Sequence, residues 1–150
     1  MAVLIAIHVL AAVVWVGGMF FAYTVLRPAA GPLDPGVRLP LWHRVLGRFF
    51  IWVWASIALL LISGFGMIFG YLGGFAAAGV HVHLMVGIGI IMMLLFTYLY
   101  FGPWRRFADA HAGGRLPEAG AELNRTRLIV AVNLLLGLAT VVVGASGRFW

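Results

Sequence analysis

The charged residues leave long stretches of this chain without any formal charge, and that distribution constrains the fold more than any other feature. The first charged residue is Arg27, so Val3–Leu26 is uninterrupted apolar sequence, and no charge occurs from Phe49 to Trp104. About 20 apolar residues cross the hydrocarbon core of a bilayer as a helix. The composition is 64% hydrophobic and 9% charged, whereas a soluble domain carries about 25% charged residues. The chain is therefore an integral membrane protein.

Glycines divide the long uncharged stretch into two spans. Gly70–Val80 (GYLGGFAAAGV) supplies the turn, because glycine adopts the backbone conformations that tight turns need. A last apolar stretch follows the polar segment that ends at Arg127. We predict an all-α, four-helix membrane bundle in a single transmembrane domain, residues 1–150, with spans at about 3–26, 49–69, 82–101 and 128–145. Two segments rich in turn-forming or polar residues, Pro28–Pro40 and Ala110–Glu122, are expected to be irregular loops.

The arginines predict the orientation of the bundle. Nine of the ten lie in the two connections that follow spans one and three, and only Arg148 lies on the other side. Short, positively charged loops stay in the cytoplasm, so both termini and the Gly70–Val80 turn are expected to face outward. The net charge of +6 therefore reports topology, and we expect no nucleic-acid partner.

The absence of cysteine limits the chemistry. A chain with no cysteine forms no disulfide, no thiolate zinc site, no iron–sulfur cluster and no covalently attached c-type haem. Any metal must be held by histidine, methionine or oxygen. The predicted spans also contain no carboxylate, which argues against a carboxylate proton relay.

Three histidines lie at one depth near the outward face, where ionisable groups are costly and mark candidate sites. His8 lies in span one, and His81 and His83 open span three. Two imidazoles from two helices of a bundle can hold a b-type haem between them. We predict His8 and His83 as the axial ligands.

The neighbours of these histidines extend the predicted site. His81 and His83 are about 200° apart on a helix, so only one of them faces the bundle, and the sequence leaves open which one. The His83 side continues through Gly87, which would admit a flat macrocycle, and the His81 side through Met85 and Met92. Residues from the other spans complete the set: Trp15 would floor the pocket beside His8, and Asn133 would bond across helices or orient a ligating imidazole.

The segment His8–Phe20 (HVLAAVVWVGGMF) resembles the opening helix of the copper-resistance D (CopD) family of bacterial inner-membrane proteins. It also resembles HemJ-type protoporphyrinogen oxidases, which share a histidine seven residues before a tryptophan. The likeness extends more loosely to His83 and to residues 124–133. It implies a multi-pass bundle in the bacterial inner membrane, a metal or haem function and, for the HemJ branch, b-haem on His8 and His83. Met85 stands where that branch has lysine, and a shift of two residues would match His81 instead.

Three functions follow as hypotheses. The preferred one is a b-type haem protein that transfers electrons at the periplasmic side, with a redox partner in the membrane or periplasm; whether it is a haem-dependent oxidoreductase stays open. The alternative is a copper-handling permease in which soft ligands hold Cu(I). The third is a structural subunit of a membrane complex. Besides the lipid bilayer, a homo-oligomer is a further candidate partner. The copper ligands would be His8, His81, His83, Met85 and Met92.

Overall fold

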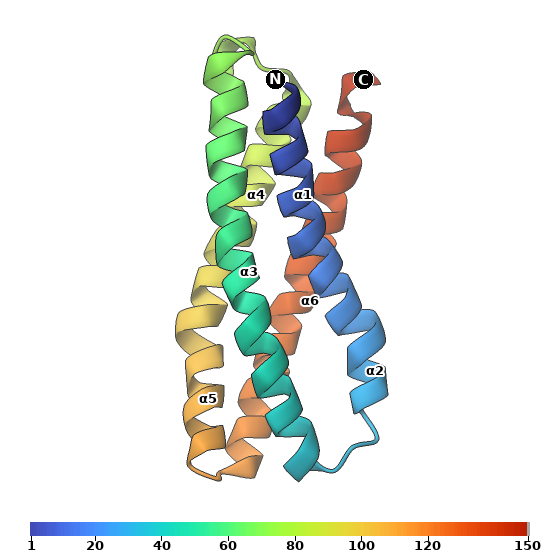
Figure 1. Ribbon diagram of the computed structural model, residues 1–150, viewed down its shortest axis with the longest axis vertical. Helices are drawn as coiled ribbons and strands as arrows, with labels where there is room; N and C mark the ends of the chain where they lie inside the picture. Colours follow the sequence, from blue (N-terminus) through green and yellow to red (C-terminus); the bar gives the residue numbers. More distant parts are fainter. Residues whose placement is uncertain (150) are drawn as a thin grey trace.

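The computed structural model describes residues 1–149, and these form four long helical rods joined by short turns (Figure 1). Each rod is long and apolar enough to cross a membrane. Two of the rods contain a π-helical stretch with a proline inside it or two residues beyond it, and proline has no N–H to donate to the preceding turn. The elements are α1 (Ala2–Phe20), η1 (Phe21–Leu26) and α2 (Arg27–Ala30); α3 (Pro35–Gly70); α4 (Val80–Leu99), η3 (Tyr100–Trp104) and α5 (Arg105–Ala112); and α6 (Leu116–Ser146), followed by the short η4 (Gly147–Phe149).

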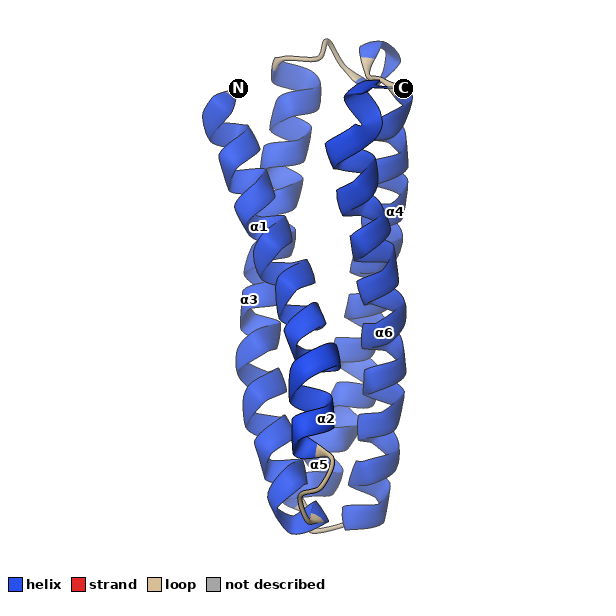
Figure 2. Cartoon of the chain, turned by 90° about the vertical axis from the view of Figure 1, so that its right-hand side faces the viewer, coloured by secondary structure: helices blue, strands red, loops and turns tan. Residues whose placement is uncertain are grey.

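The rods form two antiparallel pairs, α1 with α3 and α4 with α6. Both chain ends and the turn between α3 and α4 lie at one end of the bundle, which we call the terminal end (Figure 1). The turns that follow α2 and α5 lie at the opposite end, here called the arginine-rich end. The ribbons of the two pairs diverge toward the terminal end and come together toward the arginine-rich end (Figure 2).

Aromatic side chains fill the middle of the bundle. The ring of Phe96 on α4 packs edge-on against Phe50 at 5.4 Å and against Trp54 at 5.1 Å, both from α3. Trp15 of α1 reaches the same ring at 6.3 Å. These contacts join three of the four rods, and edge-to-face packing of this kind stabilises a core beyond the apolar area it buries.

The outer surface of the rods is apolar. Large side chains lie exposed along all four spans, as a bundle surrounded by hydrocarbon requires. Examples with more than half of their surface exposed are Val9, Leu10, Val13, Ile62, Leu94, Leu135 and Val142. The lipid bilayer is therefore in contact with the chain.

The four predicted spans are confirmed, and so is the turn between the second and third, in which Gly73 and Gly74 have positive φ. The expected irregular loops are wrong over most of their length, because α3 begins at Pro35 and the turn before α6 occupies only residues 113–115. Proline is accepted in the first turn of a helix, where its missing N–H would have no partner. Pro35 therefore begins α3, and within the 28–40 segment the turn is confined to residues 31–34.

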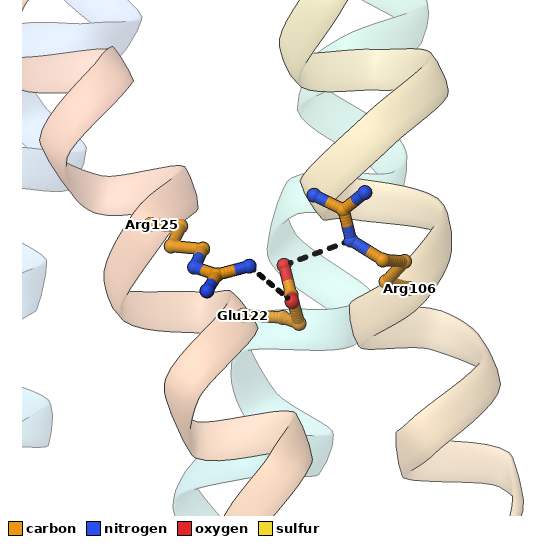
Figure 3. Close-up of polar contacts among 3 residues, drawn as sticks. All are labelled: Arg106, Glu122 and Arg125. Carbon is orange, nitrogen blue, oxygen red and sulfur yellow. Dashed lines mark hydrogen bonds and ion pairs between the residues drawn. The ribbon is translucent and has the colours of Figure 1, made fainter.

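An ion-pair network closes the arginine-rich end. Glu122 of α6 forms an ion pair with Arg106 of α5, with 3.2 Å between Oε2 and Nε, and its Oε1 accepts a hydrogen bond from Arg125 Nη1 of α6 at 2.9 Å (Figure 3). Only 14% of the Glu122 side chain is exposed, so this carboxylate is held between its two partners and ties α5 to α6.

Candidate functional site

α4 presents a histidine and a methionine to α6 near the terminal end. His81 lies beside Gly147, where an added Cβ would be 2.5 Å from His81 Cγ. One turn further along α4, Met85 lies beside Gly144, where an added Cβ would be 2.9 Å from Met85 Sδ. Real Cβ atoms essentially never approach a heavy atom within 3.0 Å. The two glycines therefore make room on α6 for an imidazole and a thioether.

Met92 continues this side of α4 deeper into the bundle. A Cβ added to Gly137 of α6 would lie 3.1 Å from Met92 Cε. Next to it, buried Asn133 donates from Nδ2 to the Met92 carbonyl oxygen at 3.1 Å, which confirms the predicted bond across helices. We call this contact the α4–α6 seam. It is formed by His81, Met85 and Met92 of α4, by Gly144 and Gly137 of α6, and by Gly147, which directly follows α6.

His8 faces α3. Its Nδ1 lies 2.9 Å from Ser63 Oγ, and Ser63 in turn donates its hydroxyl hydrogen to the Leu59 carbonyl at 2.5 Å. Because that hydrogen is used, the serine oxygen accepts from His8 Nδ1–H, and Nε2 of His8 keeps its lone pair. Gly64 is the neighbour that admits the ring, since a Cβ there would be 3.3 Å from His8 Cε1.

His83 lies on the outside of the terminal end. Its Nδ1 donates to the Gly79 carbonyl at 3.1 Å, and its exposed ring packs at a tilt against Phe75 at 6.0 Å. One turn further along the helix, Gly87 is exposed, and an added Cβ there would meet no atom within 4 Å. The side of α4 that carries His83 and Gly87 therefore points away from the seam.

Both imidazoles of the predicted haem site are oriented through Nδ1, which leaves Nε2 as the available ligand atom, as in many metal sites. Among the contacts of the described residues, however, His8 is joined to α3 and His83 to the turn before α4, and none links the two. Trp15, the predicted pocket floor, is 2% exposed and packs in the aromatic core. Within residues 1–149, no three His, Asp or Glu side chains group to hold a metal ion. The haem site stays a prediction.

Two further histidines meet at the arginine-rich end. The rings of His43 on α3 and His111 on α5 lie 5.1 Å apart. His43 stacks on Trp104 at 5.4 Å, and His111 stacks on Phe107 at 6.1 Å. Sequence reasoning paired neither histidine, because the residues lie far apart in the chain and no local pattern shows that α3 and α5 bring them together.

Comparison with known protein families supplies one match. The sequence model described as CopD, copper resistance protein D, matches residues 43–146, more than half of the chain. This chain belongs to the CopD family. No curated protein and no solved structure matched it.

The CopD match extends from within α3 to the end of α6. It includes every residue of the α4–α6 seam except Gly147, and it includes both His43 and His111. It begins after α1, whose segment His8–Phe20 carried the resemblance found by inspection. Membership of the CopD family therefore rests on most of α3 together with α4, α5 and α6.

Proposed function

We propose that this CopD-family chain is a copper-handling membrane protein and that the α4–α6 seam carries its Cu(I) ligands. The single observation that supports the choice of ligands is the placement of His81 and Met85, one turn apart on α4 and both against glycines at the end of α6. Copper is the cargo in this proposal, not a resident cofactor.

The donor atoms suit the reduced ion. Cu(I) is soft and favours thioether and imidazole ligands, whereas hard cations favour the carboxylates that the predicted spans lack. Cu(I) is also stable with two or three ligands, so a histidine and a methionine suffice to hold it. Met92 offers a second thioether about 10 Å deeper along the helix, at 1.5 Å per residue.

The location of the donors gives the proposal a direction. His81 and Met85 lie toward the terminal end, and the positive-inside rule assigns the opposite, arginine-rich end to the cytoplasm. The ligands would then meet copper from the outer side of a bacterial inner membrane. Met92 and the buried amide of Asn133 lie on the inward side of that first site.

The test is a Cu(I) titration of the purified full chain in detergent, performed without oxygen against a coloured Cu(I) chelator. We expect His81→Ala and Met85→Leu each to weaken Cu(I) binding by at least about tenfold, the low end of what even outer-shell partners contribute. The matched controls are His83→Ala, on the exposed side of α4, and Met93→Leu, beside the seam. Both should bind Cu(I) like the wild type.

The same preparation tests the competing functions. A Soret band that shifts on reduction and disappears in His8→Ala and His83→Ala would replace the copper proposal with the haem hypothesis. Cu(I) affinity that is unchanged in both seam variants, or lost equally in the controls, would refute the seam as the site. A colourless protein that binds no Cu(I) would leave the structural role.

A further inference from the structure

Two imidazole rings from different rods meet at the arginine-rich end, where α3 and α5 are in contact (Figure 1). The ring centroids of His43 on α3 and His111 on α5 lie 5.1 Å apart, with 41° between the ring planes. Both side chains are half-buried, so the pair is open to solutes at this end of the bundle. These two histidines lie at the opposite end of the bundle from His81 and Met85 of the α4–α6 seam.

The nitrogen atoms of this pair are available to a ligand. Among the described residues, no hydrogen bond joins either ring to another group, whereas Nδ1 of His8 and Nδ1 of His83 each form one. Nδ1 of His111 is also shielded from solvent, so it is a buried polar atom without a partner. Such an atom in a native structure points to an ordered water or an ion. Each neutral imidazole has one nitrogen lone pair with which to bind a metal ion.

Aromatic side chains hold both rings in place. His43 stacks on Trp104 with 5.4 Å between the ring centroids and 19° between the planes. His111 stacks on Phe107 in the same way, at 6.1 Å and 17°. Phe107 is fully buried and Trp104 nearly so, which makes the two stacking partners part of the core. Rings that are already held by packing lose little further freedom when they bind an ion, and this preorganisation favours binding.

The separation of the two rings suits one metal ion between them. A histidine nitrogen binds a metal at about 2.0–2.1 Å, so an ion shared by two imidazoles places their ring centroids about 5–6 Å apart. The observed 5.1 Å falls in that range. Zn²⁺ takes three or four protein ligands, but within residues 1–149 no third His, Asp or Glu side chain joins this pair to hold an ion. Cu(I) accepts imidazole and is stable with two ligands.

The charge of this end also favours a monovalent ion. Nine of the ten arginines lie in the two connections at the arginine-rich end, against all four acidic residues, so positive charge is in excess there. Arg44 directly follows His43 in the chain and is exposed. Coulomb repulsion from fixed positive charges is twice as large for Zn²⁺ as for Cu(I). Two neutral imidazoles supply no negative charge that would offset this difference.

We propose that His43 and His111 form a second Cu(I) site, at the cytoplasmic end of the bundle. This inference rests on the proposed function, because the ion is the same cargo that the α4–α6 seam would bind from the outer side. The two sites share no residue, and they lie toward opposite ends of the rods. The histidine pair is therefore placed where copper that has crossed the membrane would be held before its release.

The test counts the Cu(I) ions bound by the purified full chain, titrated without oxygen against a coloured Cu(I) chelator. We expect two ions per chain in the wild type and one in the seam double variant, His81→Ala/Met85→Leu. Adding His43→Phe or His111→Phe to that variant should weaken the remaining site by at least about tenfold. Phenylalanine keeps the aromatic stack, so the fold is preserved while the donor atom is lost. The matched control, His83→Phe in the same background, should still bind one ion.

X-ray absorption of copper bound to the seam double variant gives an independent readout. Nitrogen neighbours without sulfur would support the histidine pair, whereas a sulfur neighbour would overturn it, because the ion would then lie on methionine. Binding that both phenylalanine variants leave unchanged would overturn the inference, as would Zn²⁺ binding to the seam double variant as tight as that of Cu(I). An ion lost in the phenylalanine variants but not in the seam variant would refute the seam alone, and the reverse result would refute the pair alone.

Discussion

Gly17 and Gly18, adjacent in α1, should respond in opposite ways to the same substitution. A Cβ added to Gly18 would lie 2.8 Å from Cζ of Phe49 on α3, and closer still to Cε2 of the same ring. A Cβ added to Gly17 would meet nothing within 4 Å. The close approach of α1 to α3 therefore depends on one glycine of the pair and not on the other.

The magnitudes follow from this geometry. Gly18→Ala forces the Phe49 ring aside in a packed contact, and such overpacking costs about 1–3 kcal/mol. Gly17→Ala adds no contact and reduces the conformational freedom of the unfolded backbone, which stabilises a helix by roughly 0.5–1 kcal/mol. Both variants share this backbone contribution, so they should differ by the overpacking cost alone, about 1–3 kcal/mol in free energy of unfolding.

The assay is reversible unfolding of the purified chain in mixed micelles, with the denaturing detergent increased stepwise and helix content followed by circular dichroism. Gly18→Ala should unfold at a lower detergent fraction than the wild type, and Gly17→Ala at the same or a higher one. Equal midpoints for both variants would refute the reasoning that the ring of Phe49 occupies the place of the missing side chain. Phe49→Leu combined with Gly18→Ala should recover part of the loss, because the shorter side chain leaves room for the new methyl group.

The same unfolding assay tests two polar contacts, one of Asn133 and one of Glu122. Asn133→Asp replaces a buried amide donor by an acid at membrane depth and should destabilise the bundle by about 2.5–3.5 kcal/mol, so unchanged stability would contradict the burial of this side chain. Glu122→Gln weakens the pairing with Arg106 and should cost about 1–2 kcal/mol, between the ranges for exposed and buried ion pairs. Glu118→Gln, in the exposed pair with Arg115, is the control and should change stability by less than about 0.5 kcal/mol. Similar losses in the two glutamate variants would show that the partial burial of Glu122 has no energetic consequence.

Hydropathy was enough to locate the four spans, because each needs a continuous apolar stretch, and charges or the glycines of the Gly70–Val80 turn mark where these stretches end. It was not enough to find where the helices end. Polar residues beyond the hydrocarbon core were interpreted as loops, yet α3 begins at Pro35 and α5 continues to Ala112. Outside the membrane a helix is held by caps and side-chain packing, here including the stacked rings of His43 and Trp104, and none of these contacts is visible in a hydropathy profile.

Contacts between segments far apart in the chain were the second feature that could not be predicted from the sequence. No local pattern indicated that Trp42 and Thr126 lie together with Arg127, because these residues come from different helices and each is ordinary in its local context. His8 shows the same limit in a single side chain. Its position in the first span was predicted, but its partner, Ser63, depends on how α1 is rotated against α3, and neither helix alone determines that rotation.

The α4–α6 seam shows what a periodic pattern can and cannot specify. Residues 81, 85 and 92 of α4 are separated by four and seven positions. Residues 137 and 144 of α6 and residue 147, which directly follows it, are separated by seven and three, so each set lies along one side of its rod. In an antiparallel pair these spacings match closely, and each larger side chain of α4 meets a glycine of α6. The pattern of either helix predicts a packing face, but the match between the faces requires both helices in register. If the seam is a copper site, that register also sets the distances between its ligands. Gly144→Ala should then weaken Cu(I) binding in the chelator titration, even though this substitution removes no donor atom.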